Sequence, residues 1–297
     1  MIVNSGNLRT LGVGFNAAFK MGRGMATSRR AIVSTSVPST TGKEEYGWLG
    51  KFPGMRKWVG DRQLNNLKAH DYSIKNEDWE DTVAVDRNDI DDDNLGIYGP
   101  MFQEMGIACE QHPDELVFGL LKAGFTTPCY DGQYFFDTDH PVLDESGVEQ
   151  SVANTDGGSG TPWFLIDDSR ALKPVIFQER KKPQFVSKDR PEDDNVFMRK
   201  QFIYGVDARY NVGFGFWQLA WGSKQTLNAA NYAAARAAMM SMKGDFGRKL
   251  GVRPRVLIVP PSLESAGLKL LNNELGANGE TNEWKGTARL EVVEWLA

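Results

Sequence analysis

Residues 94–125 read NLGIYGPMFQEMGIACEQHPDELVFGLLKAGF, a long helical pattern. Apolar residues in its first half recur every three or four positions, as on one face of an amphipathic helix: Tyr98, Met101, Phe102, Met105 and Cys109. Pro113 interrupts the pattern and two acidic residues follow it, which is typical of a helix start. The sequence therefore predicts a long helix that kinks or restarts at Pro113 and continues to Gly124.

The segments before this helix look extended and poorly able to bury themselves. Leu8, Leu11, Phe15 and Phe19 predict a short amphipathic helix over 7–21, which the glycines at 22 and 24 end. Residues 34–45 have no apolar period and predict an arm or linker. Within 46–90, the stretches HDYSIK and WEDTVAV predict two strands around a polar turn at 76–78. This long hairpin has few consecutive apolar residues, so its aromatic side chains need another surface to pack on.

The segments after the helix predict strands first and an α/β end. Residues 126–225 read mostly as strands and loops, including PWFLIDD and GFGFWQLAWG. Asn228 can cap a helix that runs through Met242, and RVLIVPP follows as a short buried strand. Ser262 can cap a further helix, and RLEVVEWL closes the chain as a strand. The predicted fold class is therefore α+β.

Composition excludes several classes of function. The 297 residues carry a net charge of −5, which indicates no general attraction to nucleic acid or to an anionic membrane. Neither a signal-peptide core nor a membrane-spanning apolar run is present in the sequence, so we expect folding in a cytoplasm. Cys109 and Cys129 form no metal-binding pair motif, and we expect two buried thiols.

The stretch DGQYFFDTDHP at 131–141 raises the question of a metal site. Asp137 and Asp139 would share one face of a strand, with His140 on the other, so these side chains lack a defined ligand geometry. We expect a polar turn anchored by Phe135 and Phe136. The acids at 89–93 fail the calcium-loop template and are expected near a helix N-terminus. We therefore predict no catalytic, cofactor-binding or metal residues, and a hydrolase using Asp137, Asp139 and His140 remains a minor alternative.

Several long stretches resemble one known family. YGWLGKFPGMRKWVGDR (46–62), DDDNLGIYGPMFQEMG (91–106), PDELVFGLLKAGFTTPCYDGQYFFDTDHPV (113–142) and KLGVRPRVLIVPPSLE (249–264) are similar to the major head (capsid) subunits of phage Mu and Mu-like prophages. The resemblance covers nearly the whole chain. It implies a Hong Kong 97-type capsid fold with an N-terminal arm at 1–37 and an extended loop at 38–90. A peripheral domain with a spine helix at 91–220 and an axial domain at 221–297 would follow.

The resemblance also implies a structural function rather than an enzymatic one. The subunit would assemble with itself, as hexamers and pentamers, into the icosahedral head of a tailed phage, enclosing DNA without sequence-specific binding. Assembly would take place in the host cytoplasm, and the product would be the virion. Implied partners are a scaffold or protease, a portal protein and decoration proteins, with no membrane. An encapsulin-like cellular shell is the alternative.

The composition of the extended loop suggests where neighbouring subunits touch. Aromatic and basic side chains that cannot bury within a thin hairpin are suited to packing on another copy. On that ground the predicted intersubunit contacts are Trp48, Phe52, Lys57, Trp58 and Arg62.

Overall fold

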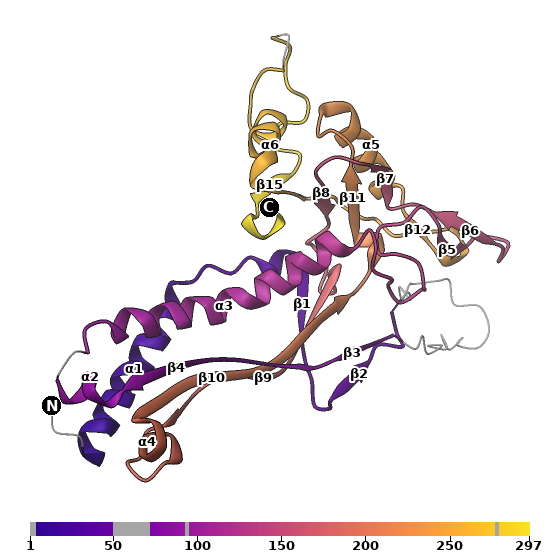
Figure 1. The fold of residues 1–297 in the computed structure, drawn as a ribbon. Helices are drawn as coiled ribbons and strands as arrows, with labels where there is room; N and C mark the ends of the chain where they lie inside the picture. The colour runs from indigo at the N-terminus through magenta and orange to yellow at the C-terminus, as the bar shows by residue number, and fades with distance from the viewer. Residues whose placement is uncertain (1–3, 50–71, 93–94, 277–278) are drawn as a thin grey trace.

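A computed structural model describes residues 4–49, 72–92, 95–276 and 279–297 (Figure 1). The helices are α1 (Ser5–Met25), α2 (Arg87–Asp91), α3 (Tyr98–Ala123), α4 (Asp194–Arg199), α5 (Ala229–Met240) and α6 (Glu264–Leu271). The strands are β1 (Ser34–Pro38), β2 (Lys43–Glu45), β3 (Ser73–Lys75), β4 (Glu77–Asp86), β5 (His140–Leu143), β6 (Glu149–Val152), β7 (Thr155–Gly158), β8 (Trp163–Ile166), β9 (Val175–Lys188), β10 (Gln201–Phe214), β11 (Ala220–Lys224), β12 (Lys243–Gly244), β13 (Arg248–Lys249), β14 (Val256–Val259) and β15 (Arg289–Val292).

The lower body in Figure 1 consists of α1, α3 and a long twisted sheet. The strand order is β1-β9-β10-β4, with β1 parallel to β9 and the other pairs antiparallel. Helices α1 and α3 pack over this sheet, and aromatic side chains fill the space between the layers. The rings of Phe15 and Phe102 lie 4.5 Å apart, and Tyr204 meets Phe15 edge-on at 5.1 Å. This cluster fixes the far end of the lower body.

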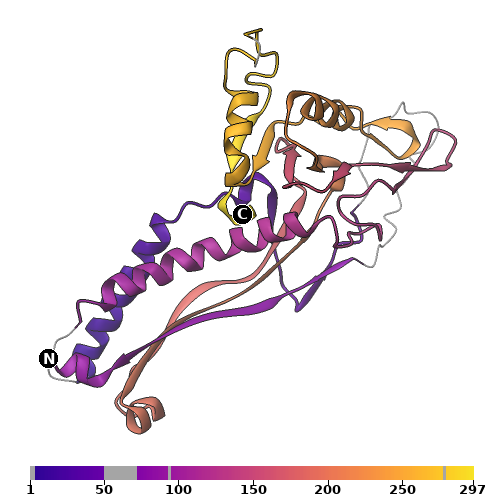
Figure 2. The ribbon, with the colours of Figure 1, turned by 45° about the horizontal axis from the view of Figure 1, so that its top comes forward.

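The upper body is built on a second, five-stranded sheet in the order β15-β14-β8-β11-β7. Strands β8 and β14 read WFLI and VLIV and are buried at every position, as expected for central strands covered on both faces. Helices α5 and α6 belong to this body (Figure 2). Asn228 caps α5 by accepting a hydrogen bond from the Asn231 N–H, as predicted.

The predicted break at Pro113 does not occur, because α3 is a single helix from Tyr98 to Ala123 that includes this proline. A proline inside a helix costs about 3 kcal/mol, so packing must offset that cost. Val117, Phe118 and Leu121 beyond the proline are fully buried in one core cluster, and Phe102 before it is fully buried in another. Burial on both sides of the proline outweighs the local penalty.

The predicted end of the first helix at Gly22 is also wrong, since α1 continues to Met25. Gly22 and Gly106 lie where α1 meets α3. An ideal Cβ on Gly22 would lie 1.9 Å from the Gln103 carbonyl oxygen, and one on Gly106 would lie 2.2 Å from the Phe19 carbonyl oxygen. These glycines therefore allow two helix backbones to touch, rather than ending a helix.

Three long-range pairings correct the predictions for residues 34–45 and 73–86. Residues 34–38 form β1 rather than a linker, and 43–45 form β2, which pairs with β3. Glu77 and Asp78, predicted as a turn, begin β4, which pairs with β10 instead of β3. Among the described residues, the two strands predicted around the turn therefore do not pair with each other. The structure of these segments is set by strand partners that lie far away in the sequence.

Smaller differences concern helix ends and one thiol. The acids at 89 and 91 lie within α2, which Asp86 caps, rather than at the start of α3. Helix α6 begins at Glu264 after a short 3-10 turn, so Ser262 is not its cap. The last strand ends at Val292. Cys129 is buried as expected, whereas Cys109 is half-buried.

Candidate functional site

The segment between α1 and β1 ties the arm to α3 through polar contacts. Arg23 pairs with Glu110 at 2.8 Å, and the carboxylate of Asp114 accepts hydrogen bonds from Ser28 Oγ at 2.6 Å and from Arg30 Nη1 at 3.3 Å. The backbone N–H groups of Arg29 and Arg30 donate to the same carboxylate. The Asp114 side chain is only 3% exposed, so these donors replace its water. We call this group the Asp114 clasp.

Arg29 extends the clasp to the C-terminal part of the chain. Its guanidinium donates to the carbonyl oxygen of Val292 and lies 3.2 Å from the Glu294 carboxylate. Arg29 thus contacts α3 through its backbone and the end of β15 through its side chain. Neither contact was predicted, because the sequence marks this region only by charge.

A second polar network holds the base of the extended loop. Tyr46 donates its hydroxyl hydrogen to Gln178 Oε1 at 2.8 Å, and Gln178 Nε2 donates to Asn76 Oδ1 at 2.8 Å. Asn76 in turn donates to Ser39 Oγ at 2.8 Å. Burial, and secondarily the charge of Glu44, raises the pKa of Tyr46 to about 12, so this hydroxyl remains a donor at neutral pH. The described ends of the loop are therefore fixed within the subunit.

Of the five residues predicted to contact neighbouring subunits, only Trp48 lies in the described part. Its ring is 6.0 Å from that of Phe216 and 6.1 Å from that of Tyr46, so it packs partly buried on the core of its own subunit. Phe52, Lys57, Trp58 and Arg62 lie outside the described residues. Their intersubunit role stays a prediction.

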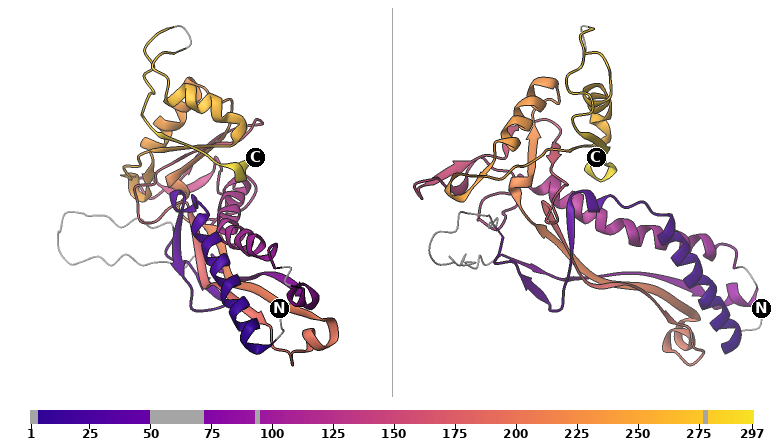
Figure 3. Two further views of the ribbon diagram at one scale, coloured as in Figure 1. Left: turned by 90° about the vertical axis from the view of Figure 1, so that its left-hand side faces the viewer. Right: turned by 180° about the vertical axis from the view of Figure 1, so that it is seen from behind.

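Helix α4 carries the most exposed large apolar side chains among the described residues. It lies between β9 and β10 at the far end of the lower body (Figure 3). Phe197 is 83% exposed and Met198 is 74% exposed, whereas Val196 is buried. Asn195 Nδ2 holds the short helix by donating to the carbonyl oxygens of Lys188 and Gln201. The signal in the sequence is the apolar triplet at 196–198, within the region predicted mostly as strands and loops.

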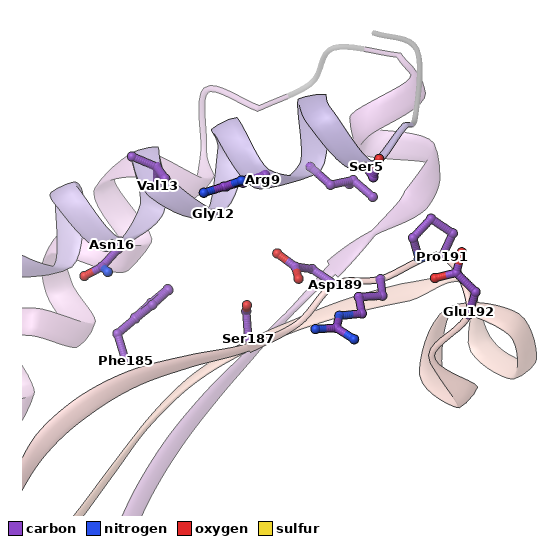
Figure 4. A pocket seen from close by; sticks show the side chains of 12 residues that line it. Ser5, Arg9, Gly12, Val13, Asn16, Phe185, Ser187, Asp189, Pro191 and Glu192 are labelled. Atoms are coloured by element: carbon purple, nitrogen blue, oxygen red, sulfur yellow. The ribbon is translucent and has the colours of Figure 1, made fainter.

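A cavity of about 510 Å³ opens between α1 and residues 185–192 (Figure 4). Leu8 and Phe185 contribute apolar surface, and Arg9, Asp189 and Arg190 bring charges of both signs. Burial, and secondarily Asp189, raises the pKa of the neighbouring Tyr204. Among the described residues that line it there is no histidine or cysteine.

The turn at 124–140 is anchored as predicted, with Phe135 and Phe136 buried. The structure does not bring Asp137, Asp139 and His140 together. Asp137 accepts from the N–H groups of Tyr134 and Thr138, and Asp139 accepts from Ser151 Oγ. The hydrolase suggested as an alternative therefore lacks its ligand set.

His140 instead contacts two residues that the sequence reasoning did not place together with it. Its Nδ1 lies 2.7 Å from Asp131 Oδ2, and Cys129 Sγ donates to Asp131 Oδ1 at 3.0 Å. Burial, with Asp131 adding to it, raises the pKa of the Cys129 thiol, which therefore stays neutral. Burial by itself raises the pKa of Asp131. Hydrogen bonds, the largest of them from His140, outweigh burial and leave the pKa of Asp131 below its ordinary value.

The fold defines a class of protein. A long helix lying on a long twisted sheet, with a second body on its own sheet and an N-terminal arm, is the architecture of Hong Kong 97-type phage capsid proteins. The solved procapsid of bacteriophage JBD30 contains a similar chain, with a TM-score of 0.86 and 44% identity, covering 99% of this chain and 100% of that chain. The chain in the JBD30 capsid gives a TM-score of 0.78 and 34% identity, covering 92% of each.

The sequence comparisons narrow the class to a family. Residues 8–296 match the family described as Mu-like prophage major head subunit gpT. The major capsid protein of Escherichia phage Mu is 46% identical over 305 residues, covering 100% of both chains. The Mu-like prophage FluMu major head subunit of Haemophilus influenzae is 48% identical over 277 residues, covering 91% of this chain and 90% of that protein. The chain belongs to the Mu-like prophage major head subunit family.

Family membership confirms the predicted function. The chain is a major capsid protein of a Mu-like tailed phage or prophage, with a structural and not an enzymatic role, and it is a component of the phage particle. Both relatives are phage or prophage head proteins, which favours this function over an encapsulin-like shell.

Among the described helices, none combines the length and the apolar character that a bilayer crossing requires.

Proposed function

We propose that the subunit assembles with itself, as hexamers and pentamers, into a closed icosahedral shell around DNA in the host cytoplasm. The observation that carries this proposal is the pair of adjacent apolar side chains on α4, Phe197 and Met198, held outward at the end of the lower body. Large apolar groups exposed side by side on a rigid element are typical of protein–protein contacts. Avidity over many such contacts can stabilise a shell even when each contact is weak.

The test replaces this surface without touching the core. The double variant Phe197→Ser, Met198→Ser should leave the thermal midpoint of the unassembled subunit unchanged, because these side chains bury little in their own chain. Particle yield, measured by electron microscopy and sedimentation, should fall at least tenfold. Arg199→Ser, an exposed polar change on the same helix, is the matched control and should assemble normally. Wild-type yield from the double variant would contradict the proposed contact.

The extended loop supplies the second proposed contact, through Phe52, Lys57, Trp58 and Arg62 together with Trp48. Support comes from the hydrogen bonds of Tyr46 and Asn76, which hold the described ends of the loop within the subunit. A deletion from residue 48 would remove Leu49, which is fully buried, so the deletion should cover 51–66 instead. We expect a soluble, folded subunit that forms no particles. Single variants Trp58→Ala and Arg62→Ala should each lower particle yield.

The four segments 1–37, 38–90, 91–220 and 221–297 remain our proposal for the arm, extended loop, peripheral domain and axial domain. They contribute strands to one another's sheets: β4 pairs with β10, and β8 pairs with β11 and β14.

Further partners are also proposed. A solved JBD30 capsid is described as decorated with minor capsid protein trimers, which supports decoration here as well. Scaffold or protease and portal proteins complete the proposal, and mass spectrometry of purified particles tests it.

A further inference from the structure

Three metal-ligating side chains meet in the turn between α3 and β5. Cys129 Sγ, an Asp131 carboxylate oxygen and a ring nitrogen of His140 all lie within 4.8 Å of one another. His140 is fully buried and Cys129 is 6% exposed. None of the three residues belongs to α4 or to the residues proposed above as intersubunit contacts.

The surroundings hold this cluster in one arrangement. The imidazole of His140 stacks on Trp217 with ring centroids 3.9 Å apart and an interplanar angle of 10°. Asp131 Oδ1 also accepts from the Gln133 N–H at 3.1 Å, which fixes the carboxylate. His140 Nε2 has no hydrogen-bond partner among the described residues. Hydrogen bonding therefore fixes the three groups but does not satisfy every buried polar atom of the cluster.

We propose that Cys129, Asp131 and His140 bind a zinc ion. One thiolate, one imidazole and one carboxylate are the donor types that Zn²⁺ takes in proteins, and three protein ligands leave a fourth position for water. On binding, the thiol proton leaves to solvent and the imidazole proton moves from Nδ1 to Nε2, so that Sγ and Nδ1 can coordinate. The two positive charges of the ion then balance the thiolate and the carboxylate, and the site becomes neutral.

The backbone N–H of Gln133 stays on Asp131 as an outer contact that orients the ligand. The ion would join the turn at 129–133 to the first residue of β5, close to the point where α3 leads into the upper body.

The test uses Co²⁺ as a spectroscopic probe on the full-length subunit, after treatment with a chelator. Thiolate ligation gives a near-ultraviolet charge-transfer band, and four-coordinate cobalt gives intense visible bands. The chain has two cysteines, so Cys109→Ala decides which thiol is responsible. Cys109 is half-buried and outside the cluster, and its replacement should leave both bands, their stoichiometric saturation and their displacement by Zn²⁺ intact.

Cys129→Ala and His140→Gln should remove the charge-transfer band and the rise in thermal midpoint that Zn²⁺ gives the wild type. If either variant fails to fold, the spectra of the wild type and Cys109→Ala still decide the question. Absence of a thiolate band in the wild type, or its loss in Cys109→Ala, would overturn the proposal.

Discussion

Gly106→Ala tests the backbone contact between α1 and α3. The added Cβ would lie 2.2 Å from the Phe19 carbonyl oxygen and 2.9 Å from the Arg23 nitrogen, both backbone atoms. Real Cβ atoms essentially never come closer than 3.0 Å, so α1 must retreat by about 0.8 Å, the difference between 3.0 and 2.2. Overpacking of this kind costs about 3 kcal/mol at its upper range, while alanine in place of glycine favours a helix by about 1 kcal/mol. The net cost is about 2 kcal/mol.

Hydrogen exchange measured peptide by peptide over α1 is the assay. A loss of about 2 kcal/mol in the free energy of local opening accelerates exchange roughly 30-fold. Gly119→Ala, on the same helix with no atom within 4 Å of the added Cβ, should leave exchange in α1 unchanged and stabilise α3 by about 1 kcal/mol. Equal exchange in α1 for Gly106→Ala and wild type would refute the argument that these glycines set the helix separation.

Three further changes test the polar contacts. Asp114→Asn should lower the free energy of unfolding by about 3 kcal/mol and accelerate hydrogen exchange in α1, because it removes a buried charge that several donors face. Glu115→Gln, at an exposed position, is the control and should have little effect on either measurement. Gln178→Ala should lower the free energy of unfolding by about 2 kcal/mol by leaving buried hydrogen-bonding groups unpaired, whereas Gln150→Ala on the surface should change it by less than about 0.5 kcal/mol. Backbone N–H groups at Thr41 and Thr40 lower the pKa of Glu44 from 4.5 to about 2, so its stabilising contribution is present above pH 4.5 and is lost as the pH falls toward 2. Glu44→Gln should therefore lower the thermal midpoint at pH 7, and its difference from wild type should shrink toward pH 2; a difference independent of pH would contradict this assignment.

Local patterns predicted the elements whose stability is local or whose apolar face is continuous. The face containing Phe102 and Met105 marked α3, the Asn228 cap marked α5, and the apolar run at 256–259 marked β14. The long similar stretches predicted the family, and through it the function.

The errors arose where distant partners decide the structure. Nothing near residues 34–38 shows that they pair with β9, 141 positions later at Ser34 and Val175. In the sequence alone, Gly22 indicates the end of a helix. Its reason becomes clear only from the structure, where the backbone of Gln103 lies against it. The cluster at Cys129 was missed for a similar reason. Asp137 and Asp139 precede His140 closely in the sequence, but the turn brings the side chain of the more distant Asp131 to the buried ring.

Arg29 makes the joint between arm and body stiff. Its backbone is held by a carboxylate on the spine, while its side chain reaches the carbonyl of Val292 in the strand that borders the upper sheet. Tilting the upper body against the lower one would stretch or release the contacts of this residue. The curvature that a subunit can accommodate is thus coupled to whether Arg29 and Arg30 keep their contacts with Asp114.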